Sequence, residues 1–159
     1  WLNGAVGAGK TGIGRALATL LPNAAFVEGD AHAGPPGLPN PRRWRMAMDA
    51  LLRMIARQRR TLVIAYPLAP REHRRLRAAC RRAHCALVVV TLATPLAIAL
   101  RGRGQRALTA AEQARTRQMH AEGYHRRRFA ALTLANAQPP PGRTARRIAR
   151  LLHRLPATR

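Results

Sequence analysis

A single lysine stands in a glycine-rich stretch near the start of the chain. Lys10 is the only lysine among the 29 lysine and arginine residues, and it lies in GAVGAGKT, residues Gly4–Thr11. This stretch fits the pattern G-x-x-x-x-G-K-[ST] in full. Such a loop points backbone N–H groups at phosphate oxygens, its lysine supplies a compact charge, and the next hydroxyl can bind Mg²⁺. A planar arginine would not fit where a slim side chain must enter. We predict that the nucleotide phosphates are bound by Gly4, Ala5, Val6, Gly7, Ala8, Gly9, Lys10, Thr11 and Gly12.

Two acidic residues follow the second apolar run of the chain. Glu28 and Asp30 alternate in FVEGDAH, in a chain that has only six acidic residues. Phosphoryl transfer needs one carboxylate on the Mg²⁺ side and another that orients or deprotonates the acceptor hydroxyl. We therefore assign Mg²⁺ to Thr11 and Glu28, and the acceptor hydroxyl to Asp30. The alternative interpretation is a turn aspartate beside a surface glutamate.

The other four acids have local explanations. Asp49 and Glu122 each lie four residues from an arginine on a predicted helix, the spacing of a surface ion pair. Glu72 and Glu112 lie in the first turn of predicted helices, where a carboxylate favours the helix dipole. The pair Glu28 and Asp30 has no such local role.

A glycine-interrupted arginine segment, RGRGQR, begins at Arg101. Cations on a closing lid stabilise the charge that develops on a transferred phosphoryl group and help to exclude water. We expect a lid over residues 101–112, with Arg101 and Arg103 acting in catalysis and Arg106 on the nucleotide. The alternative is that three arginines have no special role in a chain so rich in them.

Short apolar runs alternate with helical patterns along the chain. Runs that are apolar on both faces, such as CALVVVTLA, are typical of parallel strands covered on both sides. The pattern predicts one domain over residues 1–159 with a three-layer α/β/α fold and a parallel sheet, whose ligands bind outside the carboxyl ends of the strands. The predicted strands are Trp1–Asn3, Ala25–Glu28, Thr61–Tyr66, Ala86–Leu92 and Leu132–Ala135. The predicted helices are Thr11–Leu21, Pro41–Arg59, Arg71–His84, one capped by Thr94 before Pro95, one from Thr109 to about Arg127, and Thr144–Leu155.

Two classes of nucleotide-binding protein are disfavoured. The third strand, in TLVIAYPL, lacks the terminal aspartate of a Walker B site, which argues against the large mechanical ATPases. The guanine-reading motif N-K-x-D needs a second lysine, and the chain has none. No H-E-x-x-H motif is present, so we expect no metal site beyond Mg²⁺.

The formal net charge of +23 has two explanations. One is a polyanionic partner such as nucleic acid. The other, which we prefer, is a GC-rich genome, since the chain is rich in arginine, alanine and proline and its arginines are spread along it rather than gathered in a tail. Aromatic residues make up only 4% of the chain, so base-stacking platforms are not expected.

The location expected from the sequence is the cytoplasm. No apolar run is long enough to span a membrane, no secretory signal is visible, and Cys80 and Cys85 form no C-x-x-C pair. The oligomeric state is left open between monomer and homodimer.

These motifs together resemble those of the P-loop small-molecule kinases, the shikimate and gluconate kinase class with the nucleoside-monophosphate-kinase-like fold. FVEGDAH is similar to their acidic segment, and LPNPRRWRMAMDALL is similar to a gluconate kinase segment. WLNGAVGAGKT also resembles the start of the tunicamycin-resistance type of ATP-binding protein. The chain departs from these patterns at Glu28 and at Tyr66–Leu68, so the resemblance names no acceptor.

The resemblance implies ATP, Mg²⁺, strand order 2-3-1-4-5 and an arginine-bearing lid. We expect an ATP-dependent phosphotransferase that acts on a hydroxyl of a small molecule, such as a sugar acid or polyol. Two alternatives remain open: an ATP-binding module whose basic surface binds a polyanion, and an antibiotic-resistance protein.

Overall fold

The fold is built on one parallel sheet. A computed structural model describes residues 1–101, 107–137 and 139–154. Its sheet has the order β2-β3-β1-β4-β5, and each neighbouring pair is parallel. Both the predicted sheet and its implied order are confirmed. The strands are β1 (Leu2–Asn3), β2 (Ala24–Glu28), β3 (Thr61–Ala65), β4 (Val90–Ala93) and β5 (Leu132–Ala135).

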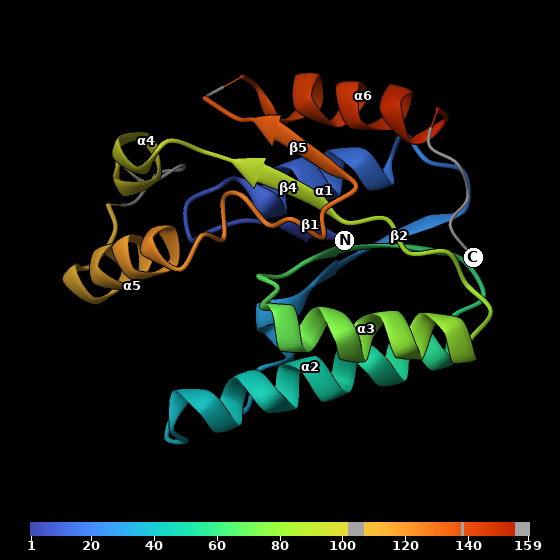
Figure 1. Ribbon diagram of the computed structural model, residues 1–159, viewed down its shortest axis with the longest axis horizontal. Helices are drawn as coiled ribbons and strands as arrows, with labels where there is room; N and C mark the ends of the chain where they lie inside the picture. The colour runs from blue at the N-terminus through green and yellow to red at the C-terminus, as the bar shows by residue number, and fades with distance from the viewer. Residues whose placement is uncertain (102–106, 138, 155–159) are drawn as a thin grey trace.

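Helices cover both faces of the sheet (Figure 1). The pair α1 (Lys10–Ala18) and α6 (Pro141–Leu152) lies on one face, and α2 (Asn40–Arg57) and α3 (Pro70–Arg82) lie on the other. A short 3₁₀ helix, η1 (Gly29–His32), follows β2. The helices α4 (Leu96–Leu100) and α5 (Ala110–Ala121) lie beyond the carboxyl ends of the strands (Figure 1). None of the helices in the described ranges is both long and apolar enough to cross a bilayer.

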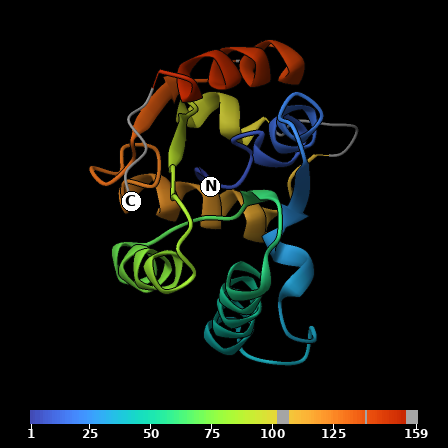
Figure 2. The same cartoon turned by 90° about the vertical axis from the view of Figure 1, so that its right-hand side faces the viewer.

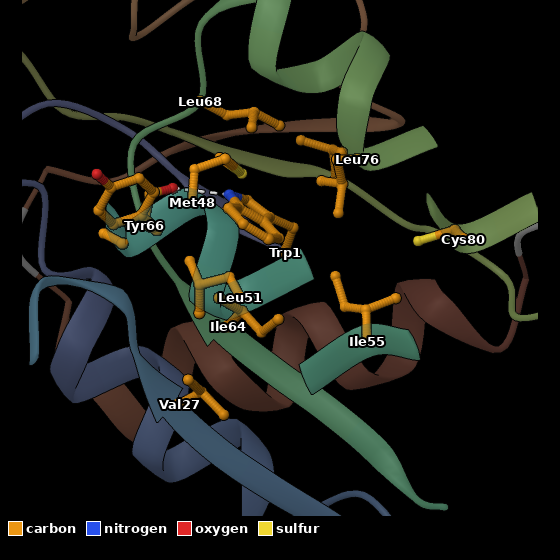
Figure 3. Packing of buried hydrophobic residues seen from close by; sticks show 12 residues of the cluster. Trp1, Val27, Met48, Leu51, Ile55, Ile64, Tyr66, Leu68, Leu76 and Cys80 are labelled. Carbon is orange, nitrogen blue, oxygen red and sulfur yellow. Dashed lines mark hydrogen bonds between the residues drawn. The ribbon is translucent and has the colours of Figure 1, made fainter. Parts of the chain in front are cut away.

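Each face of the sheet buries its own apolar core. On the α2/α3 side, Met48, Leu51 and Leu76 are fully buried against the sheet (Figure 3). On the α1/α6 side, Ile13 and Ile148 are 1% and 0% exposed. The helical spacing of Met48, Leu51 and Ile55 explains why α2 presents one apolar face. These cores fix where the strands end, and therefore where the loops after them meet.

Several element ends differ from the sequence prediction. The strand predicted over Ala86–Leu92 is shorter and later, at Val90–Ala93. The N-cap predicted at Thr94 is wrong, because Pro95 occupies that position and the Thr94 hydroxyl instead contacts the Ala8 carbonyl oxygen at 3.4 Å. Helix α5 ends at Ala121 rather than near Arg127, close to Gly123 with its positive φ of 75°.

The buried side chain of Asn3 connects four segments near the carboxyl ends of the strands. The Asn3 amide donates to Thr91 Oγ1 at 2.9 Å and to the Tyr124 carbonyl at 3.0 Å, and its oxygen accepts from the Leu68 backbone N–H at 2.9 Å. These bonds connect the end of β1 to β4, to the loop after β3 and to the turn after α5. Asn3 therefore fixes the relative positions of the segments that surround the site.

Candidate active site

A cavity of about 900 Å³ opens at the carboxyl edge of the sheet. Its walls come from the glycine loop, the end of β2, and helices α2, α3 and α5. Of the residues predicted from the sequence, Lys10, Thr11, Glu28 and Asp30 all line it. Of the other loop residues, Val6, Gly7, Gly9 and Gly12 also line the cavity, whereas Gly4, Ala5 and Ala8 lie beneath the surface of the loop.

The loop holds a backbone shape that side chains would block. Gly7 has a φ of +75°, and a Cβ added there would lie 2.4 Å from the Ala99 carbonyl oxygen. From below, the buried Asn136 amide donates to the Ala8 carbonyl at 2.8 Å. The loop is therefore held from both α4 and the segment after β5, which keeps its N–H groups in place without a ligand.

Lys10 lies inside this loop. Its ammonium donates to the carbonyls of Ala5 at 2.8 Å and Gly4 at 3.2 Å, and the residue is only 9% exposed. Burial lowers the pKa of Lys10, while the charges of Asp30 and Glu28 act in the opposite direction. A buried cation without a full counter-charge is a site that an anion stabilises.

The two acids are positioned by a glycine between them. Gly29 is buried, and a Cβ there would lie 2.4 Å from Cδ2 of the Tyr66 ring. Only a residue without a side chain lets the Tyr66 ring pack so closely against η1. Glu28 is half-buried and Asp30 is exposed, and neither carboxylate has a hydrogen-bond or ion-pair partner within the described residues.

The oxygen atoms at this site suit Mg²⁺. Mg²⁺ prefers hard oxygen ligands, and beside nucleotide phosphates it needs only one or two from the protein. The exposed Thr11 side chain and the unpartnered carboxylate of Glu28 line the same cavity and could supply them. Within the described ranges no group of three or more His, Cys, Asp or Glu side chains could hold a metal by itself. The residues present therefore fit a metal that arrives with phosphates.

The predicted lid is described only in part. Arg101 is exposed at the C-terminal end of α4, whereas Arg103 and Arg106 lie outside the described residues. Helix α5 begins at Ala110, with the predicted capping box present between Thr109 and Glu112.

The surface acids pair differently from the prediction in two cases. Asp49 pairs with Arg75 on α3, because α2 and α3 pack side by side, and not with an arginine of its own helix. Glu122, the residue that follows α5, lies 3.7 Å from Arg115, about two turns earlier in that helix, and not beside Arg126.

The cavity lining also includes polar and aromatic residues that were not predicted as site residues, among them Trp44, Tyr66, Glu72, Arg115 and Tyr124. Trp44 belongs to the predicted apolar stripe of α2, yet it is 38% exposed and faces the cavity. Glu72 caps α3 as expected, accepting from the Ala69 N–H at 2.9 Å, and also lines the cavity. The position of Tyr66 as the last residue of a predicted strand was the available signal.

These side chains form a mixed aromatic and charged wall. Burial raises the pKa of Tyr66, and Asp30, Glu72 and Tyr124 raise it further, so its hydroxyl stays protonated. The Arg115 guanidinium carbon lies 4.7 Å from the centroid of the Trp44 ring, a cation–π contact between α5 and α2. This half of the cavity therefore offers hydroxyl, carboxylate, guanidinium and ring surfaces to a small polar molecule.

Comparison with solved structures places this fold among small-molecule kinases. A shikimate kinase from Acinetobacter baumannii, solved with shikimate, is 23% identical with a TM-score of 0.70, covering 96% of this chain and 91% of that one. A gluconokinase from Sinorhizobium meliloti is 20% identical with a TM-score of 0.67, covering 96% and 93%. A tunicamycin resistance protein from Deinococcus radiodurans is 22% identical with a TM-score of 0.62, also covering 96% and 93%. No family model and no curated protein matches the chain. The chain therefore has the P-loop kinase fold that its sequence motifs predict.

Proposed function

We propose that this protein is an ATP-dependent phosphotransferase that transfers the γ-phosphoryl group of ATP to a hydroxyl of a small molecule such as a sugar acid or polyol. The main support is that the exposed part of a complete phosphate-loop motif lines one cavity of about 900 Å³ together with Glu28 and Asp30, whose carboxylates have no partner within the described residues. The likeness to shikimate kinase and gluconokinase structures supports the same class of reaction.

The nucleotide occupies the loop side of the cavity in this proposal. Backbone N–H groups of Gly4–Gly12 bind the phosphates, and Lys10 exchanges its two loop carbonyls for phosphate oxygens. Thr11 and Glu28 would hold Mg²⁺, which would neutralise the negative charge that develops on the phosphates during transfer. Adenine rather than guanine follows from the missing N-K-x-D motif.

The acceptor occupies the side lined by Asp30, Trp44 and Tyr66. Asp30 orients the acceptor hydroxyl and accepts its proton as the new oxygen–phosphorus bond forms and the bond between the β–γ bridging oxygen and the γ-phosphorus breaks. ADP leaves with the bridging oxygen. An exposed carboxylate at the mouth of the cavity can then pass the proton to water.

A lid over residues 101–112 completes the proposal. Arg101 and Arg103 would stabilise the transferred phosphoryl group, and Arg106 would contact the nucleotide. We treat residues 1–159 as one kinase-like domain that acts in the cytoplasm, as a monomer or a homodimer, with ATP and a small acceptor as its ligands.

The test is transfer of label from γ-labelled ATP. Purified protein with Mg²⁺ is incubated with pools of polyols, sugar acids, nucleosides and antibiotics, and products are separated from ATP. We expect one pool to give a labelled product that Asp30→Asn abolishes while nucleotide binding is kept. Asp49→Asn is the matched control, because Asp49 pairs with Arg75 outside the cavity. Tight ATP binding with no labelled product from any pool would refute the transferase.

Antibiotics belong in the pools for a specific reason. One similar structure is a tunicamycin resistance protein, covering 96% of this chain. A labelled antibiotic would make resistance the function, with the same residues in the same roles.

A further inference from the structure

We propose that a second, separate site on this protein binds the sugar–phosphate backbone of single-stranded nucleic acid, independently of base sequence. The site is the α2–β2 groove, a cavity of about 630 Å³ whose basic lining is Arg53, Arg57, Arg59, Arg60 and His32. None of its lining residues also lines the cavity of the candidate active site, which we call the ATP cavity.

The groove lies beside the C-terminal half of α2, and its other lining residues flank β2 or lie just before or at the start of β3. Arg53 and Arg57 come from the last turns of α2, and Arg59 and Arg60 come from the turn that leads into β3. Figure 2 looks onto the side of the molecule where the strands begin and where α2, α3 and α6 end. The ATP cavity opens at the carboxyl ends of the strands, whereas Arg59 and Arg60 of the groove lie just before β3 begins. The groove residue nearest the cavity in sequence is His32, in η1 after β2.

The groove arginines have no anionic partner. All four are exposed, and none of them makes a hydrogen bond or ion pair within the described part of the chain. No acidic residue lines the groove. Three of the six acids line the ATP cavity instead, and Asp49 and Glu122 are paired with Arg75 and Arg115.

Positive charge extends beyond the groove. Exposed arginines also lie at the ends of α3 and α6, at Arg81, Arg82, Arg150 and Arg154. Helix dipoles explain part of this placement, but each dipole supplies only about half a negative charge. The net field of this side therefore stays strongly positive and attracts a polyanion.

The shape and lining of the groove indicate which polyanion. A strand of phosphodiesters can enter a groove, whereas a flat membrane surface cannot. Guanidinium forks match phosphate oxygens, and the floor offers the apolar side chains of Ala50, Met54 and Leu62. Aromatic residues do not line the groove, so it holds no platform on which bases could stack. Binding through the backbone alone follows from this lining.

The experiment uses a labelled oligothymidylate of about 20 nucleotides and fluorescence anisotropy between about 50 and 300 mM NaCl. The groove variant carries Arg57→Ala, Arg59→Ala and Arg60→Ala. The control variant carries Arg42→Ala, Arg45→Ala and Arg117→Ala, which removes the same charge from exposed positions outside the groove. Melting curves check that both variants fold.

We expect the groove variant to bind about tenfold more weakly and to lose about two units of the salt slope, while the control stays within about threefold of wild type. Saturating ATP and Mg²⁺ should leave the oligonucleotide bound, and the groove variant should keep whatever kinase activity the wild type has. If the kinase assay shows no activity, the binding experiment still tests this proposal, because fluorescence anisotropy does not depend on phosphoryl transfer.

Four results would overturn the proposal. Equal losses in both variants would show that only total charge matters, and no loss in either would place binding elsewhere. Displacement by ATP would locate the oligonucleotide in the kinase cavity. Binding to phosphatidylserine vesicles without binding to the oligonucleotide would make the ligand a membrane.

Discussion

Positive charge has different roles at the two ends of the strands. At the carboxyl edge, Lys10 is buried, held by two loop carbonyls and close to two carboxylates. At the other edge, the arginines of the α2–β2 groove are exposed and have no partner within the described residues. A buried cation in a fixed geometry demands one residue type, whereas exposed cations act through their field and tolerate exchange.

The largest effect is expected from replacing Lys10 with the other basic residue. Lys10→Arg keeps the charge but places a planar fork where an ammonium 2.8 Å from the Ala5 carbonyl is almost fully enclosed. We expect a loss of at least about a hundredfold in transfer, near that of Lys10→Met. Labelled-ATP transfer and calorimetric nucleotide binding measure it.

The matched control for that change is Arg15→Lys on the outer face of α1. Arg15 is exposed, and its contact with the Phe26 ring is one that lysine can also make. If Lys10→Arg transferred phosphate at the wild-type rate, the buried cation would tolerate exchange as the exposed arginines do, and the contrast would be wrong.

The next effect tests the support beneath the loop. Asn136→Ala removes the donor 2.8 Å from the Ala8 carbonyl and leaves that buried oxygen with only the 3.4 Å contact to Thr94. We expect a loss of about 2 kcal/mol in unfolding free energy and weaker nucleotide binding, because the loop is less preorganised. Urea unfolding and calorimetry measure the two quantities.

Asn40→Ala serves as the control for this support. Asn40 is exposed at the start of α2, so its change should stay within about 0.5 kcal/mol. If Asn136→Ala were as mild, the loop would be held mainly by α4.

A smaller effect is expected at the opposite edge. Arg57→Lys with Arg60→Lys keeps both charges, and neither side chain has a hydrogen-bond or ion-pair partner in the part of the chain that the structure describes. Oligonucleotide affinity should fall by less than about threefold, and kinase activity should not change. A loss as large as that of the alanine variant would mean that the groove reads guanidinium geometry and not charge alone.

The contrast also explains what the sequence could predict. The loop motif and the alternation of strands and helices are local patterns, so the three-layer fold and the positions of Lys10 and Asp30 at the carboxyl ends of the strands follow from them, whereas the strand order came from the resemblance to P-loop kinases. The N-cap of α4 did not follow, because the Thr94 hydroxyl bonds to the Ala8 carbonyl, a tertiary contact that overrides the local capping preference.

Other features arise only from the packing of distant segments. Arg115 meets Trp44 across the cavity, and Asp49 meets Arg75 between two helices. Nothing in the spacing of these residues reveals either contact. Likewise, the sequence gives the total charge, but the gathering of unpaired arginines around one groove depends on which helices end side by side.

The smallest predicted effect concerns two partly buried histidines whose side chains become cationic only at acid pH. The rings of His120 and His125 stack with centroids 4.7 Å apart, and His120 Nε2 and His125 Nδ1 are buried without a hydrogen bond in the described structure. Burial lowers the pKa of both histidines. The charge of His125 lowers the pKa of His120 further, and the charges of Arg126 and Arg127 lower that of His125. A lowered pKa means that the unfolded chain binds protons first as the pH falls below about 6.5, so stability is lost in that range. His120→Gln should therefore shrink the drop in Tm between about pH 7.5 and 5.5, whereas His153→Gln, at an exposed position after α6, should not. An unchanged drop in His120→Gln would show that the stacked pair carries none of the acid sensitivity.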